Sequence, residues 1–228
     1  MTTIVLSGSL GATSAIWDAQ RPALAGRSLV AVDHPGHGGA PVVDVATVRD
    51  LATRVLETAG DERFSFVGLS LGGAVGMQLA LDAPDRVEKL VLACTSARFG
   101  EPEQWLERAA TVRAEGLAAI VDAVLARWFT PAYRDVERWR EMFLSTDPEG
   151  YARCCEALAA WDVREELRDV AAPTLVIAAA EDPATPPEQL EAIAEAIPGA
   201  RLELIERAAH LANVEHADEF NRLLEGWL

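Results

Sequence analysis

Short apolar runs alternate with amphipathic stretches along most of the chain. The apolar runs have the length of strands and span residues 4–7, 28–33, 63–69, 87–94, 173–180 and 201–205. Helical spacing of apolar residues predicts helices over residues 46–59, 71–83, 187–197 and 213–228. Because neighbouring parallel strands need a long crossover, which is usually a helix, this alternation predicts an α/β fold with a mostly parallel sheet of about six strands.

The alternation stops over residues 99–167, which contain several helical patterns and no convincing strand. Four of the six tryptophans lie in this segment, at Trp105, Trp128, Trp139 and Trp161, and suit a small core of its own. Ligands of open α/β sheets bind at the carboxyl ends of the strands, and the segment follows the end of the fourth predicted strand. We therefore predict a core of residues 1–98 and 168–228, with residues 99–167 inserted as a helical lid.

Composition and charge narrow the class of protein. The 228 residues suit one domain with an insertion, and no stretch reaches the roughly 18 apolar residues of a membrane span. The first residues lack the basic region of a signal peptide, so we expect a cytoplasmic protein. The formal net charge of −16 argues against nucleic acid and membrane surfaces as partners. A small anionic substrate is still compatible with this net charge if arginines at the binding site make the local potential positive.

The cysteines and two of the histidines give no sign of a metal or cofactor site. Cys94, Cys154 and Cys155 form an odd set, which favours reduced thiols over disulfides. His34 and His37 are separated by Pro35 and Gly36, which prevents a shared helical face, and no cysteine or carboxylate cluster completes a ligand set. We expect a structural loop there, and neither a metal nor a cofactor.

Ser70 lies between two glycines where a predicted strand gives way to a predicted helix. The motif is Gly68-Leu69-Ser70-Leu71-Gly72, the G-x-S-x-G pattern of a nucleophile elbow. A sharp turn at the serine crowds its neighbours, and glycine relieves that crowding. The alternative is an ordinary glycine-rich turn, such as a phosphate cradle, so the assignment of Ser70 as a nucleophile needs partners elsewhere in the chain.

Two such partners follow later strands. A serine nucleophile needs a histidine base, and the histidine needs an acid that fixes its tautomer. His210 comes shortly after the strand at 201–205, and Asp182 comes directly after the strand at 173–180, so both belong to the sheet edge that carries Ser70. Glu181 is the rival acid, and we favour Asp182 because its shorter side chain precedes a proline. The order Ser70, Asp182, His210 is that of α/β-hydrolases.

Two backbone amides complete the predicted site as an oxyanion hole. Leu71 follows the nucleophile at a helix N-terminus, and Ser9 lies in the loop after the first strand. Leu10, in the same loop, is a further substrate-binding candidate.

The chain resembles the α/β-hydrolase superfamily over its full length, and within it the 3-oxoadipate enol-lactonases of the β-ketoadipate pathway of aromatic-compound catabolism. Superfamily motifs are Leu6-Ser7-Gly8-Ser9-Leu10-Gly11, Asp33-His34-Pro35-Gly36-His37-Gly38, Gly68-Leu69-Ser70-Leu71-Gly72-Gly73 and Ala209-His210. Segments similar to the enol-lactonase lid are Thr95-Ser96-Ala97-Arg98-Phe99-Gly100, Arg127-Trp128-Phe129-Thr130-Pro131 and Tyr151-Ala152-Arg153-Cys154-Cys155-Glu156. Two features depart from the resemblance: Gly8 stands where the enol-lactonases tend to have asparagine, and we expect the sheet to lack the N-terminal β-hairpin usual in the family.

The resemblance implies a serine hydrolase that converts 3-oxoadipate enol-lactone to 3-oxoadipate. The free carboxylate of this substrate needs a cation, for which the candidates are Arg98, Arg127, Arg134, Arg138 and Arg153. Among these arginines we favour Arg127, and we predict that Arg127 and its neighbour Trp128 bind the substrate. A general carboxylesterase or a carbon–carbon bond hydrolase of the same fold is the alternative, and a non-catalytic binding module is a third. Relatives that use an aspartate nucleophile do not fit Ser70.

Overall fold

The computed structural model describes residues 3–228 and contains the predicted sheet. Its strands are β1 (Thr3–Ser7), β2 (Ser28–Val32), β3 (Phe64–Leu69), β4 (Val87–Ala93), β5 (Thr174–Ala179) and β6 (Arg201–Ile205). They pair in the order β2-β1-β3-β4-β5-β6, and every pairing is parallel. The α/β prediction is confirmed, with each strand within a residue of its predicted ends.

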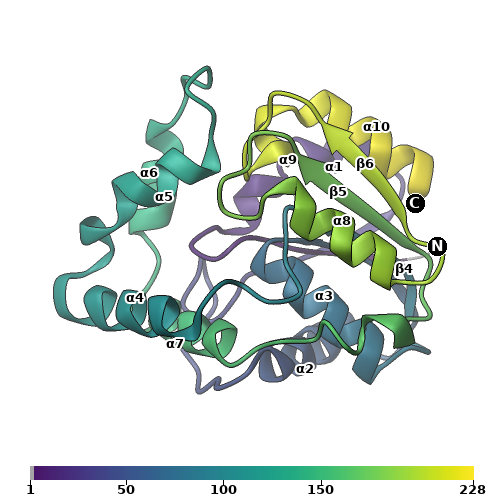
Figure 1. Cartoon of the computed structure of the whole chain (residues 1–228), viewed down its shortest axis with the longest axis horizontal. Helices are drawn as coiled ribbons and strands as arrows, with labels where there is room; N and C mark the ends of the chain where they lie inside the picture. The colour runs from purple at the N-terminus through teal and green to yellow at the C-terminus, as the bar shows by residue number, and fades with distance from the viewer. Residues whose placement is uncertain (1–2) are drawn as a thin grey trace.

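Helices cover both faces of the sheet (Figure 1). On one face lie α2 (Val48–Ala59) and α3 (Leu71–Asp82); on the other lie α1 (Gln20–Ala23) and α10 (Ala217–Trp227), and α8 (Pro187–Ala196) packs on β5 and β6. α3 is buried from Leu71 to Ala80. A helix that is apolar on all sides belongs in a protein core, and burial this deep fixes the start of α3 against the sheet.

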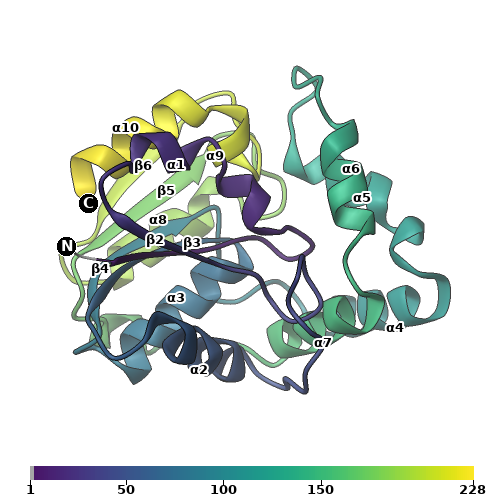
Figure 2. The same cartoon turned by 180° about the vertical axis from the view of Figure 1, so that it is seen from behind.

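The segment between β4 and β5 contains helices and, within the described residues, no strand. These are α4 (Pro102–Glu115), α5 (Val121–Trp128), α6 (Glu137–Leu144) and α7 (Pro148–Ala159), called here the inserted helices, with short 3₁₀ turns at Leu117–Ala119 and Leu167–Asp169. α4 packs on α7, while α5 and α6 stand together beyond the carboxyl edge of the sheet (Figures 1 and 2).

A backbone contact joins α7 to the loop after β2. A Cβ atom added to Gly150 would lie 2.5 Å from the carbonyl oxygen of Pro35, so this position has room for glycine only. The amide of Asp147, which caps α7, donates to the carbonyl of Gly36 at 2.7 Å. Tyr151, the next residue of α7, stacks on His37 with ring centroids 6.4 Å apart. The start of α7 is therefore fixed to the core.

The predicted last helix is interrupted. α9 (Ala212–Glu215) and α10 are separated at His216, whose backbone is not helical (φ −126°, ψ 52°). The ring of His216 is half-buried and donates from Nε2 to the carbonyl of Arg207 at 3.0 Å, which holds the break in place. In the part of the chain that the structure describes, no helix has the length and apolar content needed to cross a membrane.

Candidate active site

Ser70 occupies a strained turn between β3 and α3. Its backbone has φ 58° and ψ −115°, a conformation that residues other than glycine rarely adopt. A Cβ atom on Gly72 would overlap the carbonyl of Ser7 in β1, and one on Gly68 would overlap the backbone of Gly72. The flanking glycines therefore allow the turn to pack directly against the neighbouring strand, with the Ser70 side chain at the sheet edge.

Asp182 and His210 form a buried pair at the same edge. His210 Nδ1 lies 2.8 Å from Asp182 Oδ2, and the two residues are 4% and 3% exposed. The Asp182 carboxylate also accepts hydrogen bonds from the amides of Ala184 (2.8 Å) and Thr185 (3.1 Å) and from the Thr185 hydroxyl (2.6 Å). This network orients the imidazole so that Nε2 faces away from the carboxylate.

The network also sets the charge of the carboxylate. Burial raises the pKa of Asp182, but attraction to His210 and the hydrogen bonds from His210 and Thr185 outweigh it, so the net pKa is lowered. Glu181, the rival acid, is exposed and contacts the β6–α9 loop through its backbone amide, which donates to Ala208 at 2.9 Å. The geometry therefore brings Asp182, and not Glu181, to the histidine.

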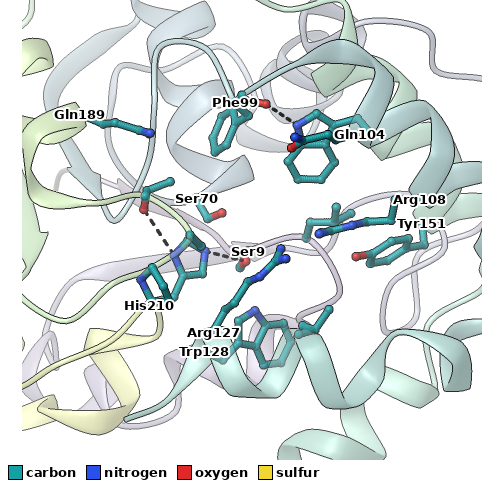
Figure 3. Close-up of a pocket in the computed structure, with 17 residues that line it drawn as sticks. Ser9, Ser70, Phe99, Gln104, Arg108, Arg127, Trp128, Tyr151, Gln189 and His210 are labelled. Carbon is teal, nitrogen blue, oxygen red and sulfur yellow. Dashed lines mark hydrogen bonds between the residues drawn. The ribbon is translucent and has the colours of Figure 1, made fainter.

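Ser70 and His210 line one pocket of about 290 Å³ together with Ser9, Leu10, Arg127 and Trp128 (Figure 3). Among the described residues, the hydroxyl within hydrogen-bonding distance of His210 Nε2 is that of Ser9, at 3.5 Å. Catalytic hydrogen bonds are often long or poorly aligned before substrate binds, so this geometry does not exclude Ser70 as a partner of His210. Of the sequence-predicted site residues, Asp182 and Leu71 do not line this pocket: Asp182 lies behind His210, and Leu71 contributes its backbone.

Some backbone amides at this sheet edge lack acceptors in the described chain. Within residues 3–228, the amides of Ser70 and Gly72 donate to the carbonyls of Ala93 and Gly8, each at 3.0 Å, whereas those of Ser9 and Leu71 donate to no protein acceptor. An unpaired amide at a helix N-terminus attracts negative charge. Ser9 and Leu71 are thus among the amides available to an anionic oxygen.

His34 and His37 hold the loop that carries Ser9. The amide of Gly11 donates to His37 Nε2 at 2.9 Å, the opposite ring nitrogen of His37 donates to the carbonyl of Pro35 at 2.9 Å, and His34 Nε2 donates to the carbonyl of Gly8 at 3.1 Å. Burial lowers the pKa of His37 to about 3, with His34 adding to the effect, so the ring stays neutral and can accept the Gly11 bond. The sequence predicted a structural loop here but not its connection to the site.

Two arginines give the pocket a positive wall. Arg108 of α4 is half-buried and Arg127 of α5 is exposed, and both line the pocket. In the described part of the chain neither has a carboxylate within 4 Å, whereas Arg98, Arg138 and Arg153 pair with carboxylates. Burial and the charge of Arg108 lower the pKa of Arg127.

Arg108 is a pocket residue that sequence reasoning missed. Its guanidinium lies over the ring of Trp105, 4.8 Å from the centroid, and beside Tyr151 (Figure 3). The helical spacing of residues 104, 105 and 108, which places them on one side of α4, is the signal that could have identified it.

The loop that carries His210 is fastened to the inserted helices. The amide of Leu211 donates to the carbonyl of Trp128 at 2.9 Å. The carboxylate of Glu215 accepts hydrogen bonds from the amides of Ala209 (3.0 Å) and Thr130 (3.1 Å) and from the Thr130 hydroxyl. Glu215 and Thr130, called here the carboxylate latch, thus tie the residue before His210 to the chain that follows Trp128.

The buried cysteines are not reactive thiols, and the described residues contain no cluster of metal ligands. Burial raises the pKa of the Cys154 thiol to about 12 and also raises the pKa of Cys94, so both thiols stay protonated. Among the described residues, no group of three or more histidine, cysteine or carboxylate side chains is arranged to hold a metal ion.

Comparison with known proteins places this chain in a family. Residues 2–217 match the family described as alpha/beta hydrolase fold, and the chain belongs to that family. It is 35% identical to 3-oxoadipate enol-lactonase 2 of Acinetobacter baylyi, over 97% of this chain and 86% of the relative. It is 33% identical to the putative carbamate hydrolase RutD of Azorhizobium caulinodans, over 99% of this chain and 91% of the relative.

A solved structure agrees with these relatives. The enol-lactonase from Burkholderia xenovorans LB400 superimposes with a TM-score of 0.93 and 39% identity, covering 99% of this chain and 90% of that one. The chain is therefore a hydrolase related to enol-lactonases, and the resemblance drawn from its motifs is confirmed.

Proposed function

We propose that the protein is a serine hydrolase whose triad is Ser70, His210 and Asp182. The observation that carries this proposal is the buried Asp182–His210 pair, which faces the pocket lined by Ser70. His210 Nε2 takes the proton of Ser70 as its Oγ attacks the substrate carbonyl, and Asp182 stabilises the resulting imidazolium. The unpaired amides of Ser9 and Leu71 bind the oxyanion.

The substrate that we propose is a small carboxylated enol-lactone, 3-oxoadipate enol-lactone, with 3-oxoadipate as product. When the Ser70 ester forms, the ring C–O bond breaks and the enol oxygen leaves, protonated by His210, while it remains attached to the acyl chain. Water activated by His210 then cleaves the Ser70 ester, and the released enol relaxes to the ketone. The enol-lactonase relatives support this choice.

The positive wall binds the free carboxylate in this proposal. Arg108 and Arg127 are cations without carboxylate partners in the described chain, and an acidic protein that keeps two such cations at one pocket favours an anionic ligand. Trp128 and Leu10 supply apolar contact for the ring. Residues 99–167 act as the lid over this pocket, and a cytoplasmic location stays a prediction.

A fluorophosphonate probe and two substrates test the proposal. The wild-type protein should be labelled covalently, and Ser70→Ala should not be; labelling that persists in this variant would exclude Ser70 as the nucleophile. Ser65→Ala, a buried serine of β3 that does not line this pocket, is the matched control and should still be labelled. Enol-lactone turnover far above that of a neutral aryl ester separates the lactonase from a general carboxylesterase.

A further inference from the structure

The pocket extends on both sides of Ser70. In Figure 3, Arg108, Arg127 and Tyr151 approach from one side and Gln189 from the other, with Ser70 between them. A small enol-lactone keeps its leaving group in the ring and carries one anionic arm, which the arginines satisfy. Such a substrate carries no second arm for the Gln189 side of the pocket.

Gln189 contains a buried polar atom without a partner in the described chain. It lies in the first turn of α8, and its Oε1 is buried yet accepts no hydrogen bond from the residues that the structure describes. A buried acceptor without a partner costs roughly 1–3 kcal/mol, so a bound water is the expected partner of this oxygen.

A second cavity of about 350 Å³, called here the side cavity, adjoins the pocket at this point. Gly100 and Gln189 line both spaces. The side cavity is lined by the buried apolar residues Ala97, Leu167 and Ile193. Its two arginines are already paired, Arg98 with Glu101 at 2.9 Å and Arg164 with Asp162 at 2.7 Å. The lining therefore suits an uncharged apolar group better than an anion.

We propose that the side cavity receives the alkoxy group of an acyclic ester, so that the enzyme also hydrolyses monoalkyl esters of short dicarboxylic acids. The inference rests on the proposed serine hydrolase and extends its substrates. The free carboxylate binds Arg108 and Arg127, the ester carbonyl lies at Ser70, and the alkyl chain passes Gln189 into the side cavity.

The reaction is an ordinary ester hydrolysis in two steps. Ser70 Oγ bonds to the ester carbon and passes its proton to His210, and the alkoxy C–O bond breaks as His210 protonates the leaving alcohol. Water then attacks the acyl-enzyme, gives a proton to His210 and releases the dicarboxylate, and Ser70 regains its proton. One water is consumed, and one acid and one alcohol are formed.

Chain length provides the first test. With the monomethyl, monoethyl and monobutyl esters of glutaric acid, kcat/KM should rise about two- to fourfold for each added methylene that enters the side cavity. The corresponding dialkyl esters, which lack the carboxylate, should be poorer substrates. Equal rates for methyl and butyl esters, or no hydrolysis of any monoester, would overturn the inference.

A variant that fills the side cavity provides the second test. Ala192 is exposed on α8 and lines the side cavity, and Ala192→Phe should reduce the butyl-to-methyl ratio of kcat/KM to about one. Glu191→Phe is the matched control, since this exposed neighbour is not part of the lining and should keep the wild-type ratio. Each ratio is measured within one protein, so partial loss of folded enzyme cancels; if Ala192→Phe does not fold, Ala192→Leu replaces it. An unchanged ratio would contradict the proposal.

The two proposals fail in different ways. Turnover of enol-lactone with no dependence on alkyl length removes the side cavity as a subsite and leaves the lactonase intact. Absence of both lactone and ester turnover, together with absence of fluorophosphonate labelling, removes the proposed function and this inference with it.

Discussion

The two walls of the pocket are built in different ways. At the strand ends, Ser70, Asp182 and His210 are buried and held by backbone turns and by hydrogen bonds to the loops around them. On the inserted helices, Arg108 and Arg127 are half-buried or exposed and lack carboxylate partners in the described chain. A wall fixed by backbone geometry suits bond cleavage, whereas a wall of long side chains suits choice among substrates.

The largest expected effect concerns the strand-end wall. Asp182→Asn should lower kcat/KM by about 10³- to 10⁴-fold, because an amide no longer fixes the tautomer of His210 or stabilises its charged form. Steady-state kinetics on the enol-lactone measure the loss. Glu181→Gln is the control and should stay within about twofold, since the Glu181 side chain is exposed. A large loss of kcat/KM in Glu181→Gln and none in Asp182→Asn would mean that Glu181, and not Asp182, is the acid that supports His210.

A smaller effect is expected on the helical wall. Arg108→Gln and Arg127→Gln should each lower kcat/KM for a carboxylated substrate by about 10- to 100-fold, mainly through KM, because each removes a charge-assisted hydrogen bond. A neutral ester should be affected far less. Arg134→Gln, an exposed arginine that does not line the pocket, is the control. Equal losses on charged and neutral substrates would mean that these arginines support structure and not recognition.

The carboxylate latch, Glu215 and Thr130, connects the strand-end wall to the helical wall. Removing it tests whether catalysis depends on this connection. Glu215→Gln and Thr130→Val should each lower kcat by about tenfold, because either change weakens the tie between the His210 loop and the end of α5. The double variant should lose little more than one of them, since both break the same contact. Additive losses, or a loss that only tracks thermal stability, would contradict this coupling.

The smallest expected effect concerns stability in acid. His37 has a folded-state pKa of about 3, below its unfolded value near 6.5, so the unfolded chain binds a proton first as the pH falls. The contribution of His37 to the free energy of unfolding is fully present above pH 6.5 and is lost as the pH falls toward 3. Between pH 6 and 5, this histidine should reduce the free energy of unfolding by about 1 kcal/mol. Urea titrations at both pH values measure the change, and His37→Gln should show a correspondingly smaller one.

Much of the strand-end wall could be predicted from sequence, for physical reasons. Strand periodicity placed the six strands, and parallel strands bring their carboxyl ends to one edge, so the loops holding Ser70, Asp182 and His210 had to converge there. The glycines around Ser70 marked a close approach that no other residue permits. Enol-lactonase relatives agree with the family assignment made from these motifs.

The helical wall was harder to predict because helix packing, and not local sequence, decides which arginine faces the pocket. Five arginines were candidates, and three of these pair with carboxylates elsewhere while Arg127 lines the pocket. Arg108 was missed because its direction depends on how α4 packs on α7. The role of His34 and His37 was missed for a similar reason, since their partners Gly8 and Gly11 lie in another loop.

The contact of Gly150 in α7 with the core fixes a distance along the pocket that the proposed substrate has to match. Gly150 holds α7 against Pro35, and Tyr151 stacks on His37, which in turn binds the loop of Ser9. Arg108 lies beside Tyr151, so this series of contacts sets the span from the proposed oxyanion amides to the proposed anion-binding end of the pocket. A dicarboxylic substrate fits when the distance between its two carbonyl carbons matches that span. Shorter or longer substrates lose contact with either the oxyanion amides or the arginine in this proposal.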